Sequence, residues 1–115
     1  MRIQINTHDT AGDDEFTGRV ENAVAAGLER FADHLTRIEV HLADVNAGKG
    51  GPSDKRCMIE ARPTNHAPVA VTHQANTIPD ALDGAIEKAQ RALDRALASR
   101  TDHKGRHSVR DNDLR

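Results

Sequence analysis

Hydrophobic and polar residues alternate along four short segments of the chain, a pattern that is typical of strands with one buried face. The segments cover residues 2–7, 37–43, 55–62 and 68–73. In segment 37–43, for example, Ile38, Val40 and Leu42 share one side, and polar residues occupy the other. The pattern therefore predicts four strands, with a glycine-rich loop at residues 44–54 between the second and the third.

Two further segments have the spacing of amphipathic helices, with a hydrophobic residue at every third or fourth position. The first runs from about Glu15 to His34, and the second from about Thr77 to Ala98. Thr77 is the expected N-cap, because Asp80 follows it at the capping-box position. The apolar stripes are Phe16, Val20, Val24, Leu28, Phe31 and Leu35 in the first helix, and Leu82, Ile86, Ala89, Leu93 and Leu97 in the second.

This β-α-β-β-β-α order predicts an α+β fold, a four-stranded mixed sheet with two helices packed on one face. The first β-α-β unit is expected to be right-handed, which makes the first two strands parallel neighbours. Each helix has a single apolar stripe, so both should cover the same side of the sheet and leave the other side open. We expect one domain at residues 1–98 and a basic, flexible C-terminal tail at residues 99–115, which has almost nothing to bury.

Composition limits the chemistry that this fold can carry. The 115 residues include 2% aromatic residues and have a formal net charge of −2. The chain therefore lacks stacking platforms for single-stranded RNA, and any polyanion site must be a local patch. The single cysteine, Cys57, lies on the apolar side of its strand and fits a reducing compartment. With no membrane-length apolar run and no signal-peptide pattern, the chain is predicted to be cytoplasmic.

Basic residues gather on two predicted surfaces. They are Arg37, Arg56 and Arg62 on the open side of the sheet, and Lys88, Arg91 and Arg95 opposite the apolar stripe of the second helix, with Arg100 and Lys104 beyond them in the tail. An adjacent acidic stripe of the same helix contains Asp80, Glu87 and Asp94. One interpretation is a solvated face with ion pairs within the helix, such as Glu87 to Arg91. The other is a row of phosphate contacts that follows a nucleic-acid backbone.

Catalytic and metal chemistry find little support in the sequence. The loop at residues 44–54 lacks P-loop spacing and leads into a strand rather than a helix. Histidines His34, His41, His66 and His73 are isolated, without paired helical spacing or a cysteine pair. No motif places a nucleophile beside a base. We therefore expect no enzyme, no cofactor and no metal site, and a small metal-binding protein that uses surface histidines is the third alternative.

The segment THQANTIPDALDGAIEKAQRALDRAL, the order of elements and the basic tail resemble the ribosome hibernation-promoting factors, a family that includes ribosome-associated inhibitor A. The resemblance covers about residues 1–98. Its best marker is the second helix, where the family shows a cap, an alanine in the first turn and then basic residues. The matching positions are Thr77, Ala81, Lys88, Arg91 and Arg95.

The resemblance implies a function in translation under stress or in stationary phase. Such proteins bind the small ribosomal subunit near the decoding centre, where they block translation by occupying space. Contacts to ribosomal RNA would come from the two basic sets, and no membrane or small-molecule substrate is implied. We expect a monomer when the protein is free. The alternative within nucleic-acid binding is a domain for another structured RNA.

Overall fold

The computed structural model describes residues 1–8, 14–44 and 55–106. For residue 8 and residues 99–106 the description covers the backbone alone. The elements are β1 (Arg2–His8), α1 (Asp14–Gly27), the 3₁₀ helix η1 (Glu29–His34), β2 (Leu35–Asp44), β3 (Lys55–Pro63), β4 (Val69–Ala75) and α2 (Ile78–Arg106). The strands begin and end within one or two residues of the predicted bounds. The predicted order of strands and helices is thus confirmed, with one extra short helix.

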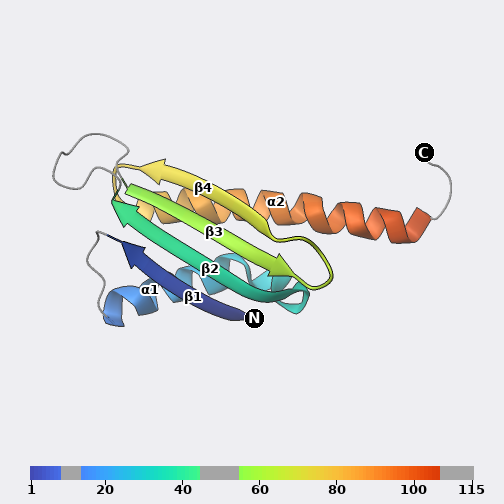
Figure 1. The fold of residues 1–115 in the computed structure, drawn as a ribbon, viewed down its shortest axis with the longest axis horizontal. Helices are drawn as coiled ribbons and strands as arrows, with labels where there is room; N and C mark the ends of the chain where they lie inside the picture. Colours follow the sequence, from blue (N-terminus) through green and yellow to red (C-terminus); the bar gives the residue numbers. More distant parts are fainter. Residues whose placement is uncertain (9–13, 45–54, 107–115) are drawn as a thin grey trace.

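The strands form one mixed sheet in the order β1-β2-β3-β4. β1 pairs with β2 in parallel, and the other neighbours are antiparallel. A parallel pair requires a crossover connection, which α1 and η1 provide. Figure 1 shows α1 and α2 on the same side of the sheet, so the predicted α+β arrangement is confirmed. We call the opposite side of the sheet the open face.

The core lies between the sheet and the helices, and it is built from the predicted apolar faces. Residues such as Val24, Leu28 and Leu93 on the helical side are fully buried, as are Ile38 and Ile59 on the strands. These side chains are aliphatic, as the low aromatic content requires. Burial of this apolar surface is the main favourable contribution to folding.

α2 begins at the predicted N-cap. The hydroxyl oxygen of Thr77 accepts a hydrogen bond from the backbone N–H of Asp80 at 3.2 Å. The carbonyl of Thr77 accepts the first intrahelical bond, from the N–H of Ala81 at 3.0 Å. These bonds satisfy groups that a helix start otherwise leaves without partners.

The prediction of one continuous helix over residues 15–34 is wrong, because α1 ends at Gly27 and η1 follows as a separate turn. A close contact with α2 explains the position of this break. A Cβ atom on Gly27 would lie 2.5 Å from Cγ2 of Ile86, so glycine lets the end of α1 pack this closely against the Ile86 side chain. The side-chain amide of Gln90 donates a hydrogen bond to the Gly27 carbonyl at 2.8 Å and satisfies it where the helix stops.

The predicted end of the second helix near Ala98 is also wrong, because α2 continues to Arg106. Figure 1 shows its C-terminal part extending past the end of the sheet. A helix that is already nucleated adds one hydrogen bond for each further residue that it orders, so it can continue without apolar contacts. Residues 107–115 of the predicted tail, and residues 45–54 of the predicted loop, lie outside the described residues.

Candidate nucleic-acid interface

The open face carries a row of arginines at one end of the sheet. Arg2 is the register partner of Arg37, and Arg37 is the register partner of Arg62. A bulge between Leu35 and Arg37 sets this register, and the hydroxyl of Thr36 within it donates to the Arg62 carbonyl at 3.0 Å. The sheet therefore brings together two of the predicted arginines, and adds a third, Arg2, that the sequence pattern did not indicate.

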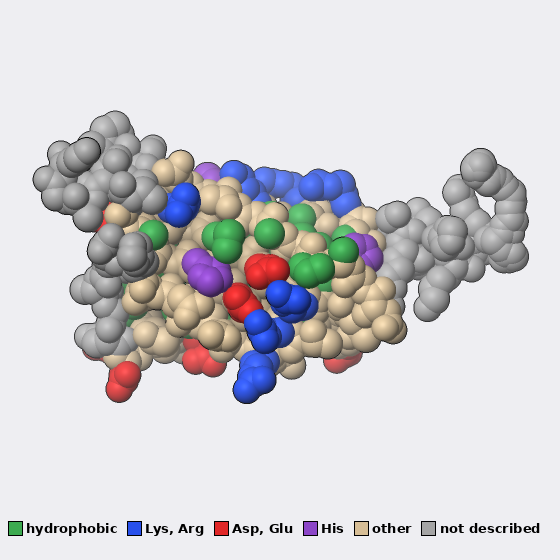
Figure 2. All heavy atoms as spheres, viewed as in Figure 1, with side chains coloured by type: hydrophobic (Ala, Val, Ile, Leu, Met, Phe, Trp, Pro, Cys, Tyr) green, Lys and Arg blue, Asp and Glu red, His purple; other side chains and the backbone are tan. Residues whose placement is uncertain are grey.

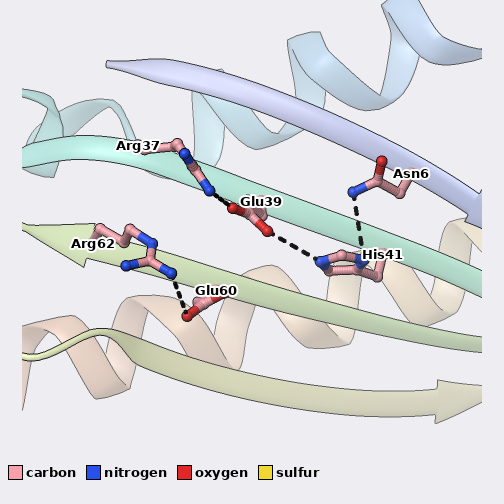
Figure 3. A network of polar contacts seen from close by, with 6 residues as sticks. All are labelled: Asn6, Arg37, Glu39, His41, Glu60 and Arg62. Atoms are coloured by element: carbon pink, nitrogen blue, oxygen red, sulfur yellow. Dashed lines mark hydrogen bonds and ion pairs between the residues drawn. The ribbon is translucent and has the colours of Figure 1, made fainter.

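Two of these arginines are paired with carboxylates of the same strands (Figure 3). Arg37 forms an ion pair with Glu39. Arg62 Nη2 lies 3.3 Å from Glu60 Oε2. Glu39 also approaches His41, with 3.4 Å between Glu39 Oε1 and His41 Nε2. The positive charge of the open face is thus partly neutralised by its own side chains.

Arg56 lies at the other end of the open face, in register with Ala43 on β2 and Gln74 on β4. Its side chain is exposed. Within residues 1–8, 14–44 and 55–106, no carboxylate forms an ion pair with it. Arg56 can therefore bind an external anion without giving up an ion pair to any described carboxylate.

The basic row of α2, defined by Lys88, Arg91 and Arg95, runs along the edge of the molecule beside β4. Figure 2 shows Lys and Arg side chains along this edge, apart from the mixed cluster in the middle of the open face. Arg91 makes the predicted ion pair with Glu87, at 3.6 Å, and both side chains are largely exposed. Arg95 is exposed, and no described carboxylate pairs with it.

Lys88 differs from the expectation of a free, exposed head. Its Nζ donates a hydrogen bond to the backbone carbonyl of Thr72 on β4 at 2.9 Å, and the residue is half-buried. Lys88 lies on α2 as predicted, but its side chain lies at the flank of the helix that faces β4. The hydrogen bond of Lys88 thus holds α2 to the edge strand β4, and its ammonium group adds positive charge to the basic row.

The acidic stripe of α2 is not a separate charged face, because Asp94 is held by Arg30 of η1. The contact is bidentate, with 2.7 Å between Arg30 Nη1 and Asp94 Oδ1 and 3.0 Å between Nη2 and Oδ2. The hydrogen bond with Arg30 lowers the pKa of Asp94, and the same bond raises the pKa of Arg30. Sequence reasoning missed this pair, since the two residues are 64 positions apart and no local pattern links them.

Arg100 and Lys104 lie in the part of α2 beyond Ala98, where the structure describes the backbone. Their predicted role in RNA binding stays a prediction.

The described histidines and the cysteine do not converge on one site. His41 belongs to the open face, whereas His73 is the register partner of the buried Cys57 on the core side. Burial raises the pKa of the Cys57 thiol to about 12. No group of three metal-ligating side chains occurs among the described residues. In the same part of the chain, no helix is long and apolar enough to cross a membrane.

Comparison with known proteins decides the family. The family model described as Sigma 54 modulation protein / S30EA ribosomal protein matches residues 3–101, nearly the whole folded part. The chain belongs to this family. The resemblance to the hibernation-promoting factors, carried mainly by the second helix, is therefore confirmed. A comparison with curated protein sequences gave no significant match.

Solved structures show that the S30EA fold is shared at low sequence identity. The N-terminal domain of Protein Y from Thermus thermophilus is similar with a TM-score of 0.66 and 23% identity, over 83% of this chain and 98% of that one. A ribosomal subunit interface protein from Coxiella burnetii is similar with a TM-score of 0.67 and 13% identity, over 85% and 99% of the two chains. At such identities the likeness establishes the fold.

Proposed function

We propose that this S30EA family protein binds the small ribosomal subunit near the decoding centre during stress or stationary phase and blocks translation there. The mechanism is occupancy of the site that transfer RNA and messenger RNA would use, with no catalytic step. The observation that carries the proposal is the basic row of α2, which projects beside β4 with Arg95 exposed and without an ion-pair partner among the described residues. Family membership gives the ribosome as the partner.

The row suits a phosphate backbone for geometric and electrostatic reasons. Lys88, Arg91 and Arg95 recur at intervals of three and four residues, so they lie on one side of α2 over about two turns. Positive charges in such a line neutralise successive phosphates and release bound counterions. The ion pair of Arg91 with Glu87 is exposed and weak, so phosphate can replace the carboxylate at little cost.

The remaining proposed contacts extend this site in two directions. Arg56 on the open face has no described ion-pair partner and can bind directly. Arg37 and Arg62 must first leave Glu39 and Glu60. Arg100 and Lys104 stay in the proposal as contacts from the end of α2 that extends past the sheet.

The proposal is tested by sedimentation and by displacement of transfer RNA. The protein should pellet with purified small subunits and not with large subunits alone. It should also displace a fluorescent transfer RNA from programmed small subunits, because both occupy the decoding region. Binding without displacement would place the protein elsewhere on the ribosome. Equal binding to an unrelated structured RNA would instead favour the alternative of a different RNA target.

A further inference from the structure

Two carboxylates lie side by side in the middle of the open face. Glu39 on β2 and Glu60 on β3 are register partners. Like charges directly opposite each other destabilise a sheet unless cations compensate them. Arg37 pairs with the first carboxylate and Arg62 with the second, while His41 lies beside Glu39 (Figure 3). The arrangement is a small block of alternating charges built across two central strands.

Exposure separates this block from the ion pairs on the helices. The side chains of Glu39 and Glu60 are 15% and 23% exposed, whereas those of their arginines are 40% and 44% exposed. On α1, by contrast, the pair of Arg19 and Glu15 is 68% and 78% exposed. A half-buried carboxylate competes for an arginine more strongly than one that water surrounds.

We propose that Glu39 and Glu60 are specificity determinants of RNA binding at the open face, a proposal that rests on the proposed function. They occupy Arg37 and Arg62 in the free protein, in the place of phosphate. An RNA backbone can bind these two arginines only when its phosphates displace both carboxylates. The isolated phosphates of a flexible RNA do not compensate for the loss of both ion pairs. A rigid RNA surface that presents several phosphates at once does.

Two details of the contacts support the exchange. The Nε atom of Arg37 is buried and has no hydrogen-bond partner among the described residues, so the pair with Glu39 leaves a donor of this guanidinium unused. After Arg37 leaves, Glu39 Oε1 still lies 3.4 Å from His41 Nε2, so this carboxylate keeps a polar neighbour. Glu39 and Glu60 lie opposite each other, so their carboxylates repel when both arginines leave at once. This repulsion adds to the free-energy cost that an RNA must overcome, and a weak ligand does not overcome it.

The test compares binding to single-stranded poly(U) RNA, a flexible non-ribosomal probe, by the parent protein and by E39Q, E60Q and the double variant. Each substitution removes a competing carboxylate and keeps the size of the side chain. For each freed arginine that binds a phosphate, the affinity for poly(U) should rise about fivefold at 0.1 M salt. The slope of log affinity against log salt concentration should steepen by about 0.7. The matched control is E15Q, which removes a carboxylate from the exposed pair with Arg19 and should change affinity much less.

A second comparison separates the release of an arginine from the general effect that removal of a negative charge has on RNA affinity. In an R62Q background, E60Q should no longer raise poly(U) affinity, because no arginine is left to free. The proposal is overturned if E39Q/E60Q binds poly(U) like the parent, or if the gain from E60Q persists in R62Q. Melting curves check folding, and if E39Q fails to fold, the E60Q and R62Q pair decides alone. Failure of the parent to bind small subunits would refute the proposed function and leave this poly(U) result standing.

Discussion

The contacts of each Lys and Arg side chain within the protein determine whether it can bind a phosphate. Arg37 and Arg62 are paired within the open face, and Lys88 donates to a backbone carbonyl of β4. Arg56 and Arg95 are exposed without an ion pair among the described residues. Alternation and helical spacing placed all five on the correct elements. Their pairing was not predictable, because it depends on rotamers and on the register between strands.

At the residue scale, the Cys57 thiol should be inert in the folded protein. Burial raises its pKa from 9.0 to about 12, so very little of the reactive thiolate forms near neutral pH. A thiol reagent at about pH 8 should label the protein only as fast as it unfolds, and rapidly in denaturant. Labelling of the native protein at the rate of a free thiol would show that Cys57 is accessible.

Asp94 should stabilise the fold in a pH-dependent way through Arg30. Because this hydrogen bond lowers the folded-state pKa of Asp94 below its ordinary value of 3.8, the contribution is present above that pH and is lost as the pH falls through the folded-state pKa. Asp94→Asn should therefore lower the melting temperature slightly at neutral pH, and the difference should vanish in acid. Asp83→Asn is the control, since Asp83 is exposed on the same helix and has no described ion pair. Identical pH profiles for both variants would contradict this role.

At the element scale, two glycines allow close packing of the helices. Gly27 lets the end of α1 approach Ile86, and Gly84 leaves space for the His73 ring between β4 and α2. Hydrophobic spacing was sufficient to locate every strand and both long helices. It missed the end of α1 and the end of α2, because a contact with another element sets the first and continued helix propagation sets the second.

Gly84→Ala should reveal the contact with His73 by a double-mutant cycle. In a His73→Ala background, the substitution should stabilise the protein by about 0.5–1 kcal/mol, because alanine is the better helix former. With His73 present, the added Cβ would collide with the ring, so the same change should destabilise the protein or gain much less. Urea unfolding of the four proteins measures the coupling. An equal effect in both backgrounds would mean that the ring moves aside freely.

At the scale of the whole molecule, the two long helices cover one face, and the candidate RNA-binding cations lie on the other face and on one edge. α2 runs beyond the sheet, so its C-terminal end projects past the layer of strands (Figure 1). The family and the fold were both predictable from the sequence, since they depend on periodicity and on the pattern in the second helix. The exact set of RNA contacts was not, because several candidate arginines have partners within the protein.

Deletion of residues 99–115 should leave the melting temperature nearly unchanged. The last described core contact on α2 is made by Leu97, so the deletion removes little buried apolar surface. Ribosome affinity should fall, because Arg100 and Lys104 are lost with it. A large drop in melting temperature would show that this segment packs on the domain.

The basic row of α2 is the surface that we propose binds ribosomal RNA. The most direct test of this claim is the affinity for purified small subunits as a function of salt, for the parent and for R91Q/R95Q. Lys88 is left intact because it also holds α2 to β4. Arg19→Gln is the matched control, since Arg19 also pairs with a glutamate one helical turn away and is similarly exposed.

R91Q/R95Q should bind small subunits about tenfold more weakly or worse at 0.1 M salt, and its slope of log affinity against log salt concentration should be shallower by about two units. R19Q should retain the parent's affinity and slope, and all three proteins should melt at similar temperatures. Parent-like binding and slope in R91Q/R95Q would contradict the claim and leave the row of α2 as a solvated face.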